Sequence, residues 1–114
     1  MKPFRNLKAG SLIEEELGKI LTRDYNFEGA LVTITDVLVD EKLLHATIKI
    51  GIIPFAKSAI AYRILTSSAS GLRQKLLKKM NIKPMPFLKF EIDTTGMTEQ
   101  EKKGTLMPEE EITQ

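Results

Sequence analysis

Apolar residues near the start of the chain lie at helical spacing. The set that falls on one helix face comprises Leu12, Ile13, Leu17, Ile20 and Leu21. Ser11, followed by a glutamate three residues later, is typical of a helix N-terminus, and the helix is expected to end near Asp24. Phe4 and Leu7 fall on the opposite side of the same helical wheel. The helix therefore begins either near Ser11 or with an earlier turn that packs separately across Gly10.

Three strands are predicted from β-branched composition and from side chains that alternate with a period of two residues. Residues 31–39 are rich in β-branched side chains, and residues 44–52 alternate strictly between apolar and other side chains. A polar turn at residues 40–42 joins them, which predicts an antiparallel hairpin with one buried face. Pro54 has no N–H to donate and so ends the second strand. Residues 87–93 alternate in the same way and predict a third strand.

Helical spacing returns between residues 56 and 80, with an interruption. The first stretch is lined by Ala56, Ile60 and Ile64, with Ala61 and Leu65 beside them, and the second by Leu72, Leu76 and Met80, with Leu77 at the edge. The join at residues 66–71 holds Thr, Ala, Ser and Gly, of which the hydroxyl residues and Gly weaken helix continuity, so a kink or short turn is expected. The order helix, strand, strand, helix, kink, helix, strand predicts an α+β domain in which helices cover one face of a three-stranded sheet.

The distribution of charge adds a functional hypothesis. Residues 42–90 contain no Asp or Glu, but they contain ten basic residues: Lys42, Lys49, Lys57, Arg63, Arg73, Lys75, Lys78, Lys79, Lys83 and Lys89. A surface of one sign attracts polyanions and binds them with release of counterions. An ordinary solvated lysine face is the alternative, and nucleic acid explains the unbroken run better. Residues 96–114 are acidic and are expected to form a mobile tail after a domain at residues 1–95.

Several classes of chemistry are excluded by what the chain lacks. Without Cys there is no disulfide, thiolate metal site or cysteine nucleophile. His45 is the single histidine, which excludes a multi-histidine metal site, and it is expected to be a surface or packing residue. No phosphate-binding glycine pattern, secretory signal or membrane-length apolar run is found. We therefore expect a cytoplasmic protein that has no enzymatic activity, cofactor or metal and does not contact a membrane.

Five segments resemble the ribosome-binding factor A family in order and spacing. They are residues 8–21, 31–37, 45–50, 69–73 and 86–90. Within the fourth, Ala69, Ser70 and Gly71 match the family's Ala-x-Gly helix kink, which stands where ordinary KH domains carry a Gly-x-x-Gly loop. The resemblance implies a type II KH-like fold. It also implies a non-catalytic assembly factor that binds the free small ribosomal subunit and assists late maturation of its ribosomal RNA.

The residues expected to contact RNA are basic ones, and the protein is expected to act as a monomer. The set comprises Arg5, Lys8, Arg63, Arg73, Lys75, Lys78, Lys79 and Lys83. Two alternatives stay open, a generic KH-type RNA-binding protein and a protein-interaction module. A generic single-strand reader often uses aromatic stacking platforms. The basic helix contains none, which favours recognition of RNA backbone and shape.

Overall fold

The computed structural model describes residues 5–80 and 85–94. Its elements in chain order are α1 (Arg5–Asp24), β1 (Leu31–Val39), β2 (His45–Ile53), the short 3-10 helix η1 (Phe55–Lys57), α2 (Ser58–Met80) and β3 (Phe87–Ile92). The predicted acidic tail at residues 96–114 and the predicted RNA contact Lys83 lie outside the described residues. In the described part of the chain, no helix is both long enough and apolar enough to cross a membrane.

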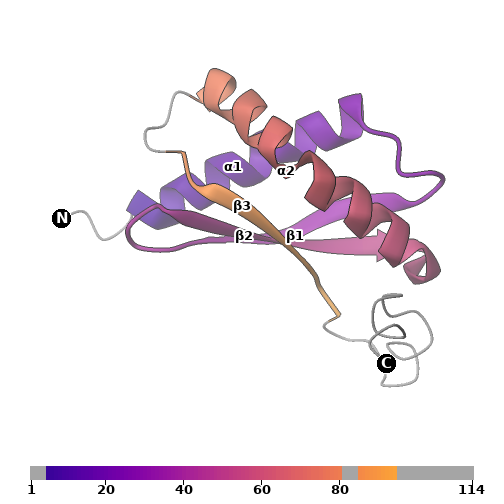
Figure 1. Ribbon diagram of the computed structural model, residues 1–114. Helices are drawn as coiled ribbons and strands as arrows, with labels where there is room; N and C mark the ends of the chain where they lie inside the picture. The colour runs from indigo at the N-terminus through magenta and orange to yellow at the C-terminus, as the bar shows by residue number, and fades with distance from the viewer. Residues whose placement is uncertain (1–4, 81–84, 95–114) are drawn as a thin grey trace.

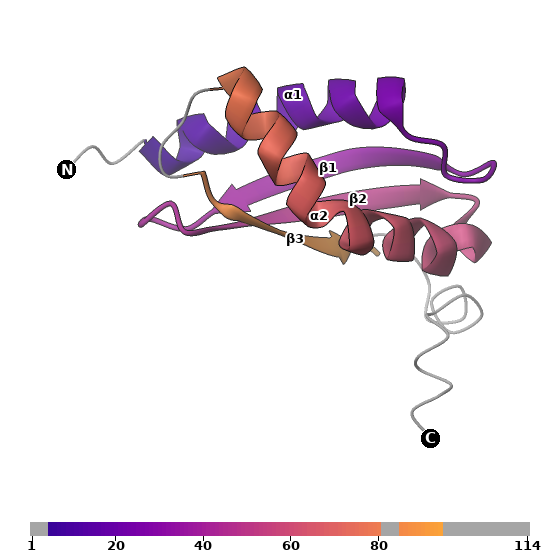
Figure 2. The same cartoon turned by 45° about the horizontal axis from the view of Figure 1, so that its top comes forward.

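The three strands form one mixed sheet in the order β1-β2-β3. β1 and β2 are antiparallel, and β3 is parallel to β2. Both helices lie on the same face of the sheet, and no described helix covers the opposite face, which we call the open side (Figures 1 and 2). Alternate residues of the central strand, Ala46, Ile48 and Ile50, are completely buried beneath the helices. The predicted hairpin and the two-layer α+β architecture are confirmed, with two long helices in place of the expected three.

Helix α1 is unbroken from Arg5, so the predictions of a start near Ser11 and of a separate earlier turn are wrong. Its first turns are held on the sheet by Asn6, whose Nδ2 donates to the carbonyl of Val39 at 3.0 Å. Gly10 is buried at the same contact. Leu12, which was placed on the apolar stripe, is 40% exposed. The helix faces the core with Ala9, Gly10, Ile13, Leu17, Ile20 and Leu21.

Substitution of the two glycines of α1 by alanine should change stability in opposite directions. A Cβ at Gly10 would lie 3.0 Å from the carbonyl oxygen of Val37, which is backbone of β1, whereas a Cβ at Gly18 has no described atom within 4 Å. We expect Gly10→Ala to lower the free energy of unfolding by about 1 kcal/mol or more through overpacking. Gly18→Ala should raise it by up to about 1 kcal/mol through helix propensity. Urea unfolding of both variants tests this, and a gain at Gly10 would contradict the close approach.

Helix α2 is also continuous, where two helical stretches had been expected. Thr66 Oγ1 donates to the carbonyl of Tyr62 at 3.0 Å and Ser67 Oγ to that of Ile64 at 3.1 Å, and such bonds to the preceding turn bend helices without ending them. Figure 2 shows the axis of α2 changing direction near its middle. The buried stripe of its first half is also shifted. Ala61 and Leu65 are fully buried, Ile60 and Ile64 are only partly covered, and Ala56 is exposed and lies in η1 rather than in α2.

Gly71 has neither of the features expected of a tight kink. Its φ is not positive, and a Cβ there would meet no described atom within 4 Å. Gly71→Ala is therefore expected to raise the free energy of unfolding by about 1 kcal/mol, the ordinary difference in helix propensity. A denaturant melt measures this, and a loss of stability would indicate a strained backbone at this position.

Candidate nucleic-acid interface

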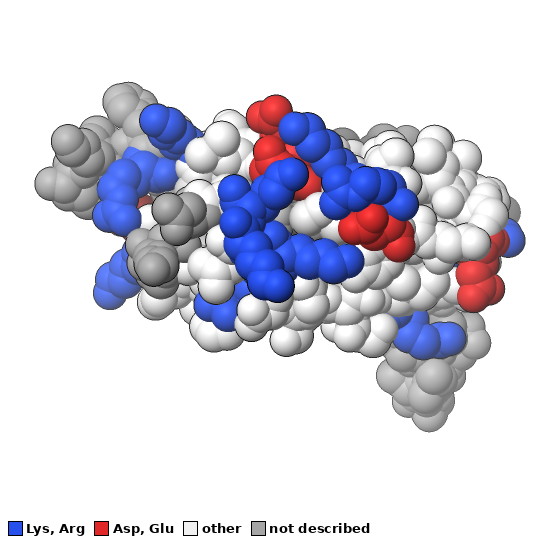
Figure 3. Space-filling view, turned by 90° about the horizontal axis from the view of Figure 1, so that it is seen from above, with Lys and Arg blue, Asp and Glu red and all other residues white. Residues whose placement is uncertain are grey.

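Basic side chains from both helices meet on the outer surface of the helical layer. Five exposed residues form what we call the basic cluster: Lys19 and Arg23 of α1, and Lys75, Lys78 and Lys79 of α2. Figure 3, which views the molecule from above, shows basic side chains gathered in the middle of this face with acidic side chains between them. The three α2 residues were predicted as RNA contacts, whereas Lys19 and Arg23 were not in that set.

The acids between these bases come from α1. Lys75 Nζ lies 3.5 Å from Asp24 Oδ2, and Lys79 Nζ lies 4.0 Å from Glu16 Oε1. Lys19 is 3.6 Å from the other carboxylate oxygen of Glu16. Residues 42–90 contain no acidic residue, but the fold places Asp24 and Glu16 of α1 beside their lysines. The lysines of these pairs are exposed and Glu16 is half-buried, and surface pairs contribute only about 0–1 kcal/mol each.

Asp24 keeps its negative charge because of its neighbours. Hydrogen bonds from Arg23, at 2.9 and 3.3 Å, lower the pKa of Asp24. Burial opposes this shift, and the charges of Arg23 and Lys75 add to it. The same hydrogen bond raises the pKa of Arg23. Asp24 thus offsets part of the positive charge of the cluster.

Among the basic residues that the structure describes in α2, Lys78 and Arg63 are exposed and have no described ion-pair partner. They are separated by about 22 Å along the helix, from its rise of about 1.5 Å per residue. The outer side of α2 therefore presents positive charge over a length that spans several phosphates of a nucleic-acid backbone.

Arg73 is used inside the protein. Its guanidinium donates to the carbonyl oxygens of Met85 at 2.6 and 3.2 Å and of Pro86 at 3.2 Å, and its Cζ lies 4.2 Å from the ring centroid of Phe87. Met85 and Pro86 are buried. Arg73, predicted to contact RNA, thus anchors the segment that leads into β3.

The predicted contact residues do not form a single site. Arg5 and Lys8 are exposed at the start of α1, roughly 24 Å or more along the helix axis from Asp24 at its end. The structure instead adds Lys19 and Arg23, together with Tyr25, whose ring centroid is 5.3 Å from Lys75 Nζ. The helical spacing of Lys19 and Arg23, four residues apart on α1, was the signal for the two missing bases. Nothing local indicated that this face of α1 lies against α2.

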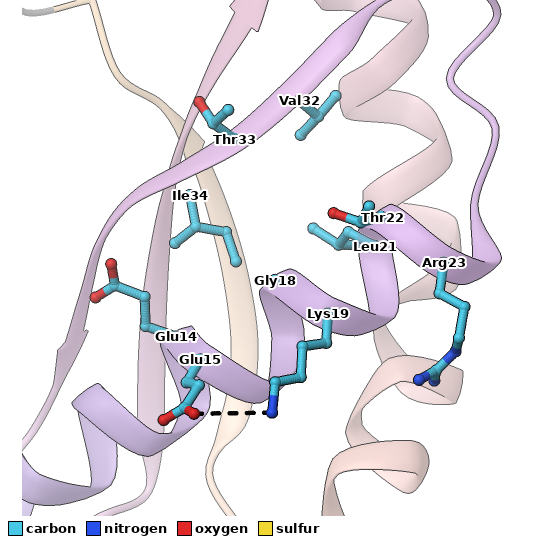
Figure 4. Close-up of a pocket in the computed structure, with 10 residues that line it drawn as sticks. All are labelled: Glu14, Glu15, Gly18, Lys19, Leu21, Thr22, Arg23, Val32, Thr33 and Ile34. Carbon is cyan, nitrogen blue, oxygen red and sulfur yellow. Dashed lines mark ion pairs between the residues drawn. The ribbon is translucent and has the colours of Figure 1, made fainter.

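A shallow groove runs between α1 and the outer strand β1. Its volume is about 750 Å³. Figure 4 shows Glu14, Glu15 and Lys19 along the helix side, opposite Val32 and Ile34 of the strand, with Glu15 paired to Lys19. Its lining contains neither His nor Cys, and its two glutamates repel phosphate. This groove is therefore a less favourable surface for a polyanion than the outer side of α2, which carries Arg63 and Lys78 without described acidic partners.

His45 lies at the end of the hairpin and is exposed, as expected of a surface residue. Its Nδ1 is 3.0 Å from Asp40 Oδ2. Burial would raise the pKa of Asp40, but hydrogen bonds from the His45 ring and from the backbone N–H groups of Leu44 and His45 lower it on balance. Asp40 is therefore an ionised carboxylate that accepts hydrogen bonds across the β1–β2 turn. Its role there is structural.

Comparison with known proteins identifies the family. The family model for ribosome-binding factor A matches residues 5–105. A ribosome-binding factor A from Parvibaculum lavamentivorans is 34% identical over 95 residues, covering 80% of this chain and 68% of the relative. The crystal structure of ribosome-binding factor A from Thermus thermophilus superposes with a TM-score of 0.65 at 15% identity, over 76% of this chain and 94% of that one. A model of the Thermus thermophilus protein fitted into a cryo-EM map of a 30S complex gives a TM-score of 0.64 at 13% identity, over 77% and 94%. This chain belongs to the ribosome-binding factor A family.

Proposed function

We propose that this protein is an assembly factor that binds the free small ribosomal subunit and assists late maturation of its ribosomal RNA. It acts in the cytoplasm as a single chain, by binding RNA and without catalysing a reaction. The observation that carries this proposal is the outer side of α2, where Arg63 and Lys78 are exposed without described acidic partners on a member of this family. A 30S complex with a structurally similar relative supports the choice of partner.

The form of the surface favours contact with phosphates over the reading of long sequences. Lysine and arginine side chains on a convex helix reach backbone oxygens, which position a protein on RNA without distinguishing bases. A structured ribosomal RNA offers such oxygens at fixed positions. Binding of this kind stabilises one RNA conformation relative to others, which is how a protein without a reaction centre assists maturation.

Association with small subunits should therefore depend strongly on salt. If about three phosphates are neutralised, the affinity should fall roughly tenfold or more between 50 and 200 mM monovalent salt at constant Mg²⁺, because counterions are released on binding. Co-sedimentation of the protein with purified free subunits in sucrose gradients measures this, with whole ribosomes as the comparison. An affinity that does not change with salt would contradict the proposal and favour the protein-interaction module.

Ribonuclease treatment separates the remaining alternatives. We expect digestion of the RNA to release the protein from captured subunits. Retention on ribosomal proteins after complete digestion would favour a protein partner. Equal binding to unrelated single-stranded RNA and to small subunits would favour the generic KH-type reader.

A further inference from the structure

A second small groove lies where α2 passes β3, and it contains an exposed aromatic ring. It is lined by Ala69, Ser70, Arg73, Phe87 and Leu88 and has a volume of about 270 Å³. Phe87 is 59% exposed, although it is the first residue of β3 and its backbone N–H is bonded to the carbonyl of Leu44 at 2.9 Å. An exposed ring on a well-anchored backbone has no evident part in the core.

Arg73 lies against this ring. Its Cζ lies 4.2 Å from the centroid of Phe87, while its nitrogens donate to the carbonyls of Met85 and Pro86. The guanidinium is therefore fixed in place by three hydrogen bonds, and it stacks on one face of the ring as a cation–π pair. Phe87 stays 59% exposed beside this pair and lines the groove, so part of an aromatic surface is pre-organised there.

We propose that this groove, which we call the Phe87 groove, binds one unpaired nucleobase of the RNA by stacking on Phe87. Aromatic side chains and arginine planes are the usual supports for splayed-out bases. The groove is slightly smaller than the roughly 300–1,000 Å³ of sites for drug-sized ligands, which suits a single base better than a longer ligand. The exposed hydroxyl of Ser70 lies at the rim, where base edges and ribose groups present hydrogen-bonding atoms.

The surrounding charge favours RNA as the source of this base. The groove is bordered by the helix that carries Lys78, and Lys89 lies two residues beyond Phe87 on β3. None of its described lining residues is acidic. The inference rests on the proposed RNA-binding function and deepens it, because it adds a base contact to a surface that otherwise touches only phosphates.

The test uses a fluorescently labelled single-stranded uridine octamer, an octamer of the same backbone without bases, and three proteins. Wild type should bind the uridine octamer about fivefold or more tightly than Phe87→Leu, given the usual contribution of one stacked base. Phe87→Tyr, which keeps a flat ring, should bind like wild type. The ratio between wild type and Phe87→Leu should be the same at every salt concentration, because no charge is altered.

The octamer without bases provides a control that leaves the protein untouched. Wild type should bind it about as weakly as Phe87→Leu binds the uridine octamer, and Phe87→Leu should lose nothing further. Equal binding of the uridine octamer by wild type and Phe87→Leu would overturn the inference, as would no binding of this octamer by wild type. Loss of small-subunit binding by Phe87→Leu with unchanged octamer binding would also overturn it, in favour of a protein partner.

Failure of the nucleobase site can be distinguished from failure of the proposed function. Co-sedimentation of wild type with small subunits is measured in parallel. If wild type co-sediments in a salt-dependent manner while Phe87→Leu and wild type bind all RNAs equally, the nucleobase site is wrong and the assembly-factor proposal stands. If wild type does not co-sediment, the proposed function is wrong whatever the octamers show. Thermal unfolding of Phe87→Leu should show at most a small loss of stability, because the ring is largely exposed and loses only its cation–π contact with Arg73.

Discussion

Simultaneous replacement of Lys75, Lys78 and Lys79 by Gln should reduce affinity for the small subunit by about 50-fold at physiological salt. This magnitude assumes that each lysine neutralises one phosphate and that counterion release follows the single-strand slope of about 0.7 per contact. The free energy of unfolding should change by no more than about 0.5 kcal/mol, because the three side chains are exposed. Co-sedimentation across a salt series measures the affinity, and the slope of the salt dependence should become shallower by about two.

A control with the same change in net charge distinguishes a local surface from general attraction. Lys42, Lys49 and Lys57 lie on the hairpin turn, the open side of the sheet and η1, outside the basic cluster and the Phe87 groove. Their joint replacement by Gln should leave most of the affinity and of the salt slope in place. Equal losses in the two triple variants would show that net charge, rather than the outer face of α2, determines binding.

The second large effect is expected at Arg73. Arg73→Met should lower the free energy of unfolding by about 2–3 kcal/mol, because it removes three charge-assisted hydrogen bonds and leaves the carbonyls of Met85 and Pro86 without these donors. Urea unfolding measures this change. Lys78→Met on the same helix is the matched control and should change stability by no more than about 0.5 kcal/mol.

Replacement of Arg73 by Lys and by Met also separates the structural interpretation of this residue from the RNA-binding one. If Arg73 mainly anchors the start of β3, a conservative Arg73→Lys variant should recover little stability, because an ammonium cannot reproduce the planar, multi-bonded contact. An Arg73→Met protein that is as stable as wild type but fails to bind subunits would instead return this residue to the RNA-binding surface.

Much of the fold follows from the regular spacing of apolar residues within short segments of the sequence. The alternation over residues 44–52 places Ala46, Ile48 and Ile50 on one face whatever the rest of the chain does, because successive side chains of a strand point to opposite sides. The observed β2, His45–Ile53, and its pairing with β1 accordingly match the prediction. The family indicated by the five short segments is confirmed by the family model, which matches residues 5–105.

The helix boundaries were predicted less well, because glycine and hydroxyl residues have several uses. Gly10 was interpreted as a possible break in α1, and Gly71 as part of a kink in α2. In the structure Gly10 permits a close approach to β1, and Gly71 is an ordinary helical residue with no described neighbour within 4 Å. Helix propensity alone cannot distinguish these cases, because tertiary packing decides which role a small residue takes.

The candidate site shows most clearly where local information ends. From the sequence alone, residues 42–90 are free of acids, and that determined correctly that the chain has a strongly basic region. Only the packing of α1 beside α2 places Asp24 next to Lys75 and Glu16 next to Lys79. Electrostatic interactions depend on distance in space, and these partners are 51 and 63 residues apart in the chain, so no local pattern contains them.

The same reason applies to the Phe87 groove. The sequence showed a basic helix without an aromatic residue and a strand that begins with Phe87. The parallel pairing of β3 with β2 brings the start of that strand under α2, where Arg73 reaches the ring. The spacing of apolar residues and the composition of the chain determined the helices and strands, their order and the positive charge of residues 42–90. The positions of side chains from different elements relative to one another, on which the proposed contacts depend, were decided by tertiary packing, because burial of apolar surface between the layers selects the arrangement of the elements.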